Sequence, residues 1–226
     1  MNIFCDLDGV LIDSRNECLE IIKNIFPEVL KSKIYNKNFY LNRGLVDPPE
    51  DFLILHELIS KLDNKKKIST RSFNFLKKSI SQRKLNIFKK NFFKTRRNLM
   101  NKNYDKWLKL NKITPFATKL NNFKNLNVII ITTKNFEASK SICKNLKINF
   151  NQIIANEHIK KKSKGELINI YLDKHNINKA IFIDDSNKHL KTCKDKRVIR
   201  LFANWGYNKT SIYKQFKLTY FKKLIN

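Results

Sequence analysis

The sequence predicts an α/β protein, a Rossmann-like parallel sheet interrupted after its first strand by an α-helical insert. Two observations carry this prediction. Residues 2–6 form a short apolar run typical of a buried strand, and from residue 114 onward strand-like runs alternate with helical stretches, as in parallel α/β sheets. The region between them shows helical spacing instead. We therefore expect two units in the 226 residues: a core formed by 1–14 and 114–226, and a helical insert at 15–113.

The composition favours a folded protein that is neither secreted nor embedded in a membrane. Hydrophobic residues make up 42% of the chain, and no apolar run approaches the roughly 20 residues that a membrane span needs. Asp6 and Asp8 occupy the place where a signal peptide would need an uncharged core, so we expect a cytoplasmic location. The four cysteines are scattered without a CxxC pair, which indicates reduced thiols. Cys5 precedes Asp6 on the expected strand and should face the opposite side, in the core.

The net charge of +28 would suit a partner that is a polyanion. Lys far outnumbers Arg, however, and Asn, Ile and Phe are abundant, as an AT-rich genome would impose on any protein. We attribute the charge to this bias and expect a small anionic substrate, without nucleic acid or membrane as a partner. No acidic residue lies between Asp63 and Asp105. We interpret this basic stretch as a solvated helix face, the alternatives being a phosphate-attracting rim or a partner surface.

The first strand ends in a tight turn that carries acidic residues. Residues 2–6 are followed by Gly9 and by a second apolar group, Val10-Leu11-Ile12. A strand that breaks at glycine and restarts briefly is typical of such a turn. Asp6 and Asp8 would lie on it.

Helical patterns then continue through the insert. Ser14 is the expected N-cap of a first helix that Pro27 interrupts. Pro48-Pro49-Glu50 opens a second helix. The apolar positions of these two helices are Cys18, Ile21, Ile22 and Ile25, then Phe52, Leu55, Leu58 and Ile59. A long segment beyond residue 67 places Phe88, Phe92, Thr95 and Leu99 on one face.

The last zone predicts the rest of the sheet. Thr114-Pro115 begins a helix with proline at its first position. Right-handed crossovers would bring the C-terminal ends of all strands to one edge. We expect strands at 128–132, 152–155, 179–184 and 197–202, separated by helices near 135–147, 164–175 and 186–194.

Acidic pairs end two of the expected strands. A carboxylate such as Asp6 can act as a covalent nucleophile toward phosphorus. Asp184-Asp185 ends a second strand, and neighbouring strand ends would bring four carboxylates together with Asp6 and Asp8. Such a cluster requires a cation, and oxygen ligands suit Mg²⁺, whereas Zn²⁺ would lack His or Cys ligands. The sequence therefore predicts a Mg²⁺ site, provided that the strands are neighbours.

Two further residues would complete a phosphate site. Thr132 ends an expected strand and can donate a hydroxyl hydrogen bond to a phosphate oxygen. Lys164, near the start of a helix, supplies a positive charge. Either residue alone is as readily structural, so the prediction depends on their joint occurrence.

The joint pattern resembles the haloacid dehalogenase superfamily. FCDLDGVLIDS at 4–14 resembles its first motif, IIITTK at 129–134 its second, KSKGELI at 162–168 its third and IFIDDS at 181–186 its fourth. Trp205-Gly206-Tyr207 resembles a segment of the phosphoglycolate-phosphatase-like branch, and the insert matches the helical cap of that branch in position but in no motif. Lys160, Lys161 and Lys162 compete with Lys164 for the role of motif lysine. The fourth motif has the DD form, without a later Asp.

The resemblance implies a mechanism and a set of residue roles. Asp6 would attack phosphorus, and Asp8 would protonate the leaving alkoxide and then deprotonate water. Mg²⁺ would be held by Asp6, the Asp8 backbone carbonyl and Asp185, with Asp184 close by or bound through water. Thr132 and Lys164 would bind the phosphoryl oxygens, and Thr133 would lie beside them on the substrate. The presence of Asp8 disfavours dehalogenation.

The sequence thus favours a phosphatase acting on a small phosphorylated metabolite. A phosphomutase of the same fold and a nucleic-acid-binding or processing protein that uses the basic insert are the alternatives, and the oligomeric state stays open. Arg43, beside Gly44 in an expected loop, is our candidate for holding the part of the substrate that is not hydrolysed, because its planar fork suits a carboxylate or second phosphate. Solvation, or pairing with Asp47 or Glu50, is the alternative for Arg43.

Overall fold

The computed structural model describes residues 1–159 and 162–225, and its chain divides into two compact units. One unit comprises Met1–Asp13 and Lys112–Asn226, and the other comprises Ser14–Asn111. These boundaries fall within two residues of those expected from the sequence.

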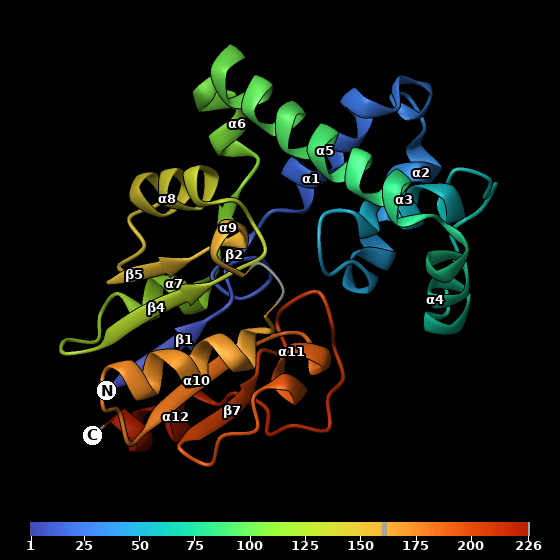
Figure 1. The fold of residues 1–226 in the computed structure, drawn as a ribbon. Coiled ribbons are helices and arrows are strands. Elements are labelled where there is room, and N and C mark those ends of the chain that lie inside the picture. Colours follow the sequence, from blue (N-terminus) through green and yellow to red (C-terminus); the bar gives the residue numbers. More distant parts are fainter. Residues whose placement is uncertain (160–161, 226) are drawn as a thin grey trace. The chain divides into compact units, whose positions relative to one another are not determined.

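The first unit is built on a parallel sheet. Its order is β5-β4-β1-β6-β7, so β1 is central and lies between β4 and β6 (Figure 1). Phe4 in β1 pairs with Ile129 in β4 and with Phe182 in β6, and all four pairings in the sheet are parallel. The predicted fold class is therefore confirmed, since every expected strand is present within two residues of its expected bounds. The strands are β1 (Asn2–Cys5), β4 (Asn127–Ile131), β5 (Gln152–Ile154), β6 (Ala180–Asp184) and β7 (Val198–Phe202).

Helices connect and flank these strands (Figure 1). Ile168 of α10 and Leu190 of α11 pack in one cluster with Phe4 and its neighbours on the sheet. Ser163 and Glu166 form a capping box that begins α10, which fixes Lys164 as the first residue of that helix. The helices of this unit are α7 (Pro115–Leu120), α8 (Phe136–Asn145), α9 (Asn156–Ile159), α10 (Lys164–Lys174), α11 (Asn187–Thr192) and α12 (Leu218–Ile225).

A short antiparallel ribbon stands where the chain leaves and re-enters this unit. β2 (Ile12–Asp13) pairs with β3 (Lys112–Ile113). The Thr114 hydroxyl donates to the Val10 carbonyl at 2.8 Å and accepts from the Ala117 N–H, so it both caps α7 and holds the turn after β1. The residues after Gly9 thus resume as a strand, as the sequence predicted.

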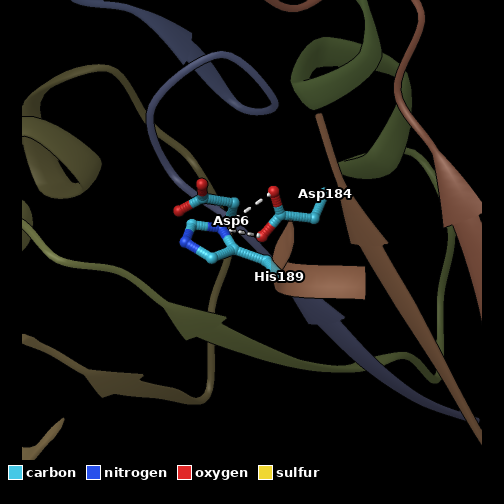
Figure 2. A group of neighbouring side chains, drawn as sticks. All are labelled: Asp6, Asp184 and His189. Carbon is cyan, nitrogen blue, oxygen red and sulfur yellow. Dashed lines mark hydrogen bonds and ion pairs between the residues drawn. The ribbon is translucent and has the colours of Figure 1, made fainter. Parts of the chain in front are cut away.

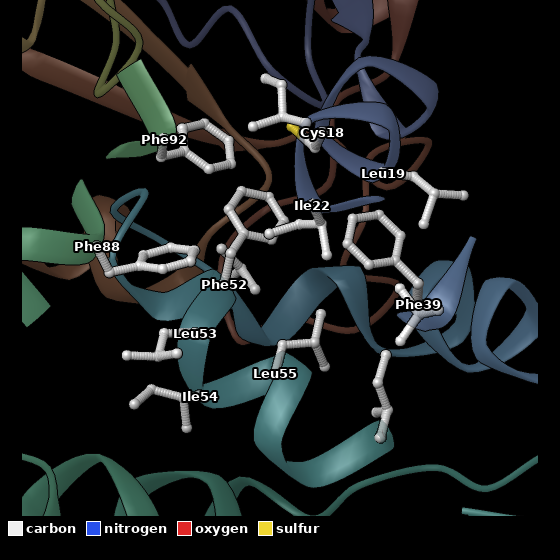
Figure 3. Packing of buried hydrophobic residues seen from close by; sticks show 14 of the residues in the cluster. Cys18, Leu19, Ile22, Phe39, Phe52, Leu53, Ile54, Leu55, Phe88 and Phe92 are labelled. Atoms are coloured by element: carbon white, nitrogen blue, oxygen red, sulfur yellow. The ribbon is translucent and has the colours of Figure 1, made fainter. Parts of the chain in front are cut away.

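In the part of the insert that the structure describes, all regular elements are helical. They are α1 (Arg15–Ile25), η1 (Pro27–Val29), α2 (Lys33–Asn42), η2 (Arg43–Leu45), α3 (Asp51–Ile59), α4 (Thr70–Ser79), α5 (Gln82–Lys102) and α6 (Tyr104–Lys109). Aromatic rings fill the centre of this unit (Figure 3), where Phe52 stacks between Phe39 at 5.7 Å and Phe92 at 5.1 Å between ring centroids. The Phe88 and Phe92 face of α5 is buried, as expected.

Helix α2 was not predicted, because its buried face mixes aromatic and amide side chains. Asn38 and Asn42 are buried beside Phe39. The Asn38 amide donates to the Asn64 carbonyl and accepts from the Lys66 N–H. The Asn42 amide oxygen accepts from the backbone N–H of Ile68. These amides replace apolar residues on the inner face, so the hydrophobic period is hidden in the sequence.

The expectation that Arg43 lies in a loop is wrong, and so is the alternative that its side chain is solvated. Arg43 begins η2 directly after α2, and only 6% of its surface is exposed. Its Nη1 donates to the Val46 carbonyl at 2.9 Å, and its guanidinium lies 4.9 Å from the ring centroid of Phe52. The planar group that suggested anion binding instead stacks within the unit, so this geometry gives no support to a substrate contact.

The four cysteines are buried free thiols, and burial together with the nearby Asp6 raises the pKa of Cys5. None of the described helices is long and apolar enough to cross a membrane.

Candidate active site

The candidate site lies at the edge where β1, β4 and β6 end. Asp6 directly follows β1, Asp184 is the last residue of β6, and Thr132 directly follows β4. The Asp6 backbone N–H donates to the Ile183 carbonyl at 3.0 Å, and the Thr132 backbone N–H donates to the Ile154 carbonyl at 2.9 Å. The ladder therefore continues one residue beyond the strands and fixes the backbone of both residues.

Lys164 connects two of the carboxylates. Its Nζ lies 2.9 Å from an oxygen of Asp6 and 2.9 Å from an oxygen of Asp184, and the residue is only 3% exposed. Burial works against the charged ammonium, but the attraction of Asp184 and Asp6 outweighs it and raises the pKa of Lys164. Among the alternative motif lysines, Lys162 is exposed, while 160 and 161 lie outside the described residues.

Asp184 has a further partner in His189, which our sequence analysis did not identify. Figure 2 shows the imidazole of His189 against the carboxylate, with Nδ1 at 3.2 and 3.0 Å from its two oxygens. Burial alone would raise the pKa of Asp184, but His189 and Lys164 lower it below its usual value. The sequence feature that could have identified His189 is its position in the first turn of α11, the helix that follows the end of β6.

Asp185 lies in a pocket made by two glycines. Gly9 has a φ of 84°, and a Cβ on it would lie 2.6 Å from an oxygen of Asp185. A Cβ on Gly206 would likewise overlap the Asp185 side chain. The next residue, Tyr207, donates its backbone N–H to Asp185 at 2.5 Å, and Trp205 Nε1 donates to the Val10 carbonyl at 3.1 Å. The Trp205-Gly206-Tyr207 segment thus links Asp185 to the turn after β1.

Asp8 pairs with Lys134, the second residue that our sequence analysis missed. Lys134 Nζ lies 3.4 Å from an oxygen of Asp8, whose side chain is 16% exposed while that of Lys134 is fully buried. The Lys134 N–H donates to the Thr132 hydroxyl oxygen at 3.2 Å. Thr132 is buried and Thr133 is half-buried. The sequence motif at 129–134 contained Lys134, but its letters alone do not show which carboxylate it reaches.

The carboxylate oxygens of the site, rather than the His189 nitrogen, are donors of the kind that a hard divalent cation prefers. Ligand atoms of Asp6, Asp184 and His189 lie within 4.8 Å of one another. Burial raises the pKa of Asp6 to about 7; Lys164 opposes this rise, and the neighbouring Asp184 adds a smaller contribution to it. Because Gly9 and Gly206 have no Cβ, neither residue overlaps the Asp185 side chain. Carboxylate oxygens at such a site suit Mg²⁺, although Lys164 and His189 already occupy the oxygens of Asp184.

Comparisons with known proteins identify the fold. No protein-family model matches the chain, and no curated protein matches it. Many solved structures do. A haloacid dehalogenase-like hydrolase from Streptococcus pneumoniae shares 19% identity, with 100% of this chain and 98% of that chain covered, at a TM-score of 0.65. A predicted phosphoglycolate phosphatase from Haemophilus somnus shares 16%, with 99% and 97% covered, at 0.67.

A third structure extends the same result. A putative phosphoglycolate phosphatase from Lactobacillus delbrueckii subsp. bulgaricus shares 12% identity, with 99% and 97% of the two chains covered, at a TM-score of 0.68. The chain therefore has the α/β fold of the haloacid dehalogenase-like hydrolases. It is similar over nearly its whole length to structures described as predicted or putative phosphoglycolate phosphatases, so the fold that the motif resemblance implied is confirmed.

Proposed function

We propose that this protein is a cytoplasmic, Mg²⁺-dependent phosphatase that hydrolyses a small phosphate monoester through an aspartyl phosphate on Asp6. The observation that carries the proposal is the buried Lys164 ammonium, which lies between the carboxylates of Asp6 and Asp184 at the C-terminal edge of the sheet. Ligands of open α/β sheets bind at this edge. A buried cation beside a strand-end carboxylate provides the charge that a phosphoryl group needs.

In the first half-reaction, an oxygen of Asp6 forms a bond to phosphorus while the bond from phosphorus to the alcohol oxygen breaks. Asp8 gives its proton to the leaving oxygen. Lys164 and the hydroxyl of Thr132 bind phosphoryl oxygens; the Thr132 oxygen accepts from the Lys134 N–H, and its O–H donates to the phosphoryl group. Mg²⁺, held by Asp6, the Asp8 carbonyl and Asp185, would offset the negative charge of the phosphoryl group.

In the second half-reaction, water attacks the aspartyl phosphate and its proton passes to Asp8. The bond to Asp6 breaks, inorganic phosphate leaves, and both carboxyl groups return to their starting states. Asp184 takes no direct part, because its oxygens are engaged by Lys164 and His189. We assign to it the orientation of Lys164.

The alternatives gain less support from the structure. A phosphomutase would use the same Asp6 chemistry, and only turnover can separate it from a phosphatase. Nucleic-acid binding by the insert would call for a concentration of charge there, but Ser14–Asn111 carries 23 Lys and Arg with nine Asp and Glu, while the remaining chain carries 24 with ten. Each unit thus has a net charge of +14, over 98 residues in the insert and 128 in the rest of the chain, so half of the charge lies outside the insert, which favours a compositional bias of the whole chain.

The test is a panel of phosphate esters with and without Mg²⁺, for the wild type and for Asp6→Asn. We expect Mg²⁺-dependent release of phosphate that falls by more than about a hundredfold in the variant, because the amide is nearly isosteric but not nucleophilic. Circular dichroism checks that the variant is folded. Retained hydrolysis at more than a few per cent of wild type would refute the role of Asp6, and transfer of phosphate between two positions of a substrate without its release would favour the mutase.

A further inference from the structure

We infer that Lys134 is the positioning residue for Asp8, an inference that rests on the proposed phosphatase function. The observation is the contact of 3.4 Å between a fully buried ammonium and an oxygen of the expected general acid and base. Lys134 is separate from Lys164, which contacts Asp6 and Asp184. The site therefore contains two buried lysines, one in contact with Asp8 and the other in contact with Asp6 and Asp184.

A packing role alone does not account for a lysine at this position. Lysine is almost never fully buried unless it is paired, because removing an ammonium from water is costly. The preceding strand, β4, consists mostly of isoleucine, and an apolar side chain would fill the same space without that cost. The contact with the Asp8 carboxylate offsets the cost of burying the charge of Lys134.

The backbone around Lys134 is fixed on both sides. Its N–H donates to the Thr132 hydroxyl at 3.2 Å, and its carbonyl accepts from the Asn156 N–H at 3.0 Å. Asp8 in turn lies in a closed turn, where Gly9 donates to the Ile12 carbonyl at 2.8 Å. Two anchored segments from different strand ends therefore define where the ammonium and the carboxylate meet.

An acid that acts in both half-reactions needs this kind of support. A carboxyl group on a single Cβ rotates readily, and each wrong rotamer takes its oxygens away from the leaving group and from water. Lys134 contacts Oδ1 of Asp8, and this contact restricts the rotation of the carboxyl group that exchanges the proton. Lys134 acts through Asp8 and has no bond to make with phosphorus.

The experiment compares Lys134→Met with a matched control, Lys144→Met, in which the replaced lysine is exposed on helix α8 of the same unit. Two substrates are used: an alkyl phosphate, whose leaving group needs a proton, and p-nitrophenyl phosphate, whose leaving group does not. For Lys134→Met we expect kcat to fall about 10- to 100-fold on the alkyl ester and less than about threefold on p-nitrophenyl phosphate, because only the first depends on general acid catalysis. KM should change little on either ester, and the control should match the wild type.

A double-mutant cycle with Asp8→Asn completes the test. If Lys134 acts through Asp8, Lys134→Met causes no further loss of alkyl-ester turnover once Asp8 is replaced. Multiplicative losses in the double variant, or equal losses on both esters, would overturn the inference while leaving the proposed function intact. A wild type that hydrolyses no ester would overturn the proposed function itself. Should Lys134→Met unfold below the assay temperature, Lys134→Gln, which keeps most of the side-chain volume, takes its place with the same expected and contrary outcomes.

Discussion

Replacing Lys164 by methionine removes the cation that separates two buried carboxylates. The Nζ atom contacts Asp6 and Asp184 at 2.9 Å each, and the side chain is 2% exposed. Deleting one partner of a buried ion pair costs about 3–5 kcal/mol, because the remaining charge stays buried without compensation. His189 still contacts Asp184 in the variant. We therefore expect a loss in the free energy of unfolding near the lower limit, about 3 kcal/mol.

Urea denaturation at neutral pH, followed by circular dichroism, measures this loss. Lys162→Met is the matched control, because Lys162 is exposed and lies two residues before Lys164 in the sequence. Its substitution should change the free energy of unfolding by less than about 0.5 kcal/mol. Asp184→Asn in the Lys164→Met background should recover part of the loss, because it removes a buried charge that has lost its ammonium partner. A loss below about 1 kcal/mol for Lys164→Met, or no recovery in the double variant, would refute the view that Lys164 holds these carboxylates together.

Three further predictions concern single residues. Gly9→Ala should abolish turnover while the far-ultraviolet circular dichroism stays native, because a Cβ would lie 2.6 Å from an oxygen of Asp185 at a φ of 84°; near-normal activity would contradict this. Arg43→Lys should destabilise the protein by about 1 kcal/mol in thermal melts, through loss of stacking on Phe52, and change kcat/KM equally for all esters; a selective loss on anionic substrates would instead restore its substrate role. Burial lowers the pKa of His56, so the folded state favours the neutral ring, and its contribution to stability should be complete above the unfolded pKa of about 6.5 and decline as the pH falls below it; His56→Gln should flatten that decline in melts between pH 5 and 7.5.

The sequence by itself determined the sheet and the edge on which the candidate site lies. Short apolar runs that end in Asp6, Thr132 and Asp184 are strands whose length and pattern are local properties, and right-handed connections bring their C-terminal ends together in any parallel sheet. The sequence alone therefore predicts that both acidic pairs lie at the same edge of the sheet. That these residues perform phosphoryl transfer is still a prediction.

Only the tertiary structure decided how the long side chains are paired. A lysine side chain is long and flexible, so its partner depends on which carboxylate lies within reach at the sheet edge. The sequence therefore does not show that Lys134 contacts Asp8 or that Lys164 contacts Asp6 and Asp184. The same reason explains Arg43, whose guanidinium lies against a ring nine residues further along the chain. Periodicity records which positions face inward, whereas the partner of a buried charge is set by residues distant in sequence.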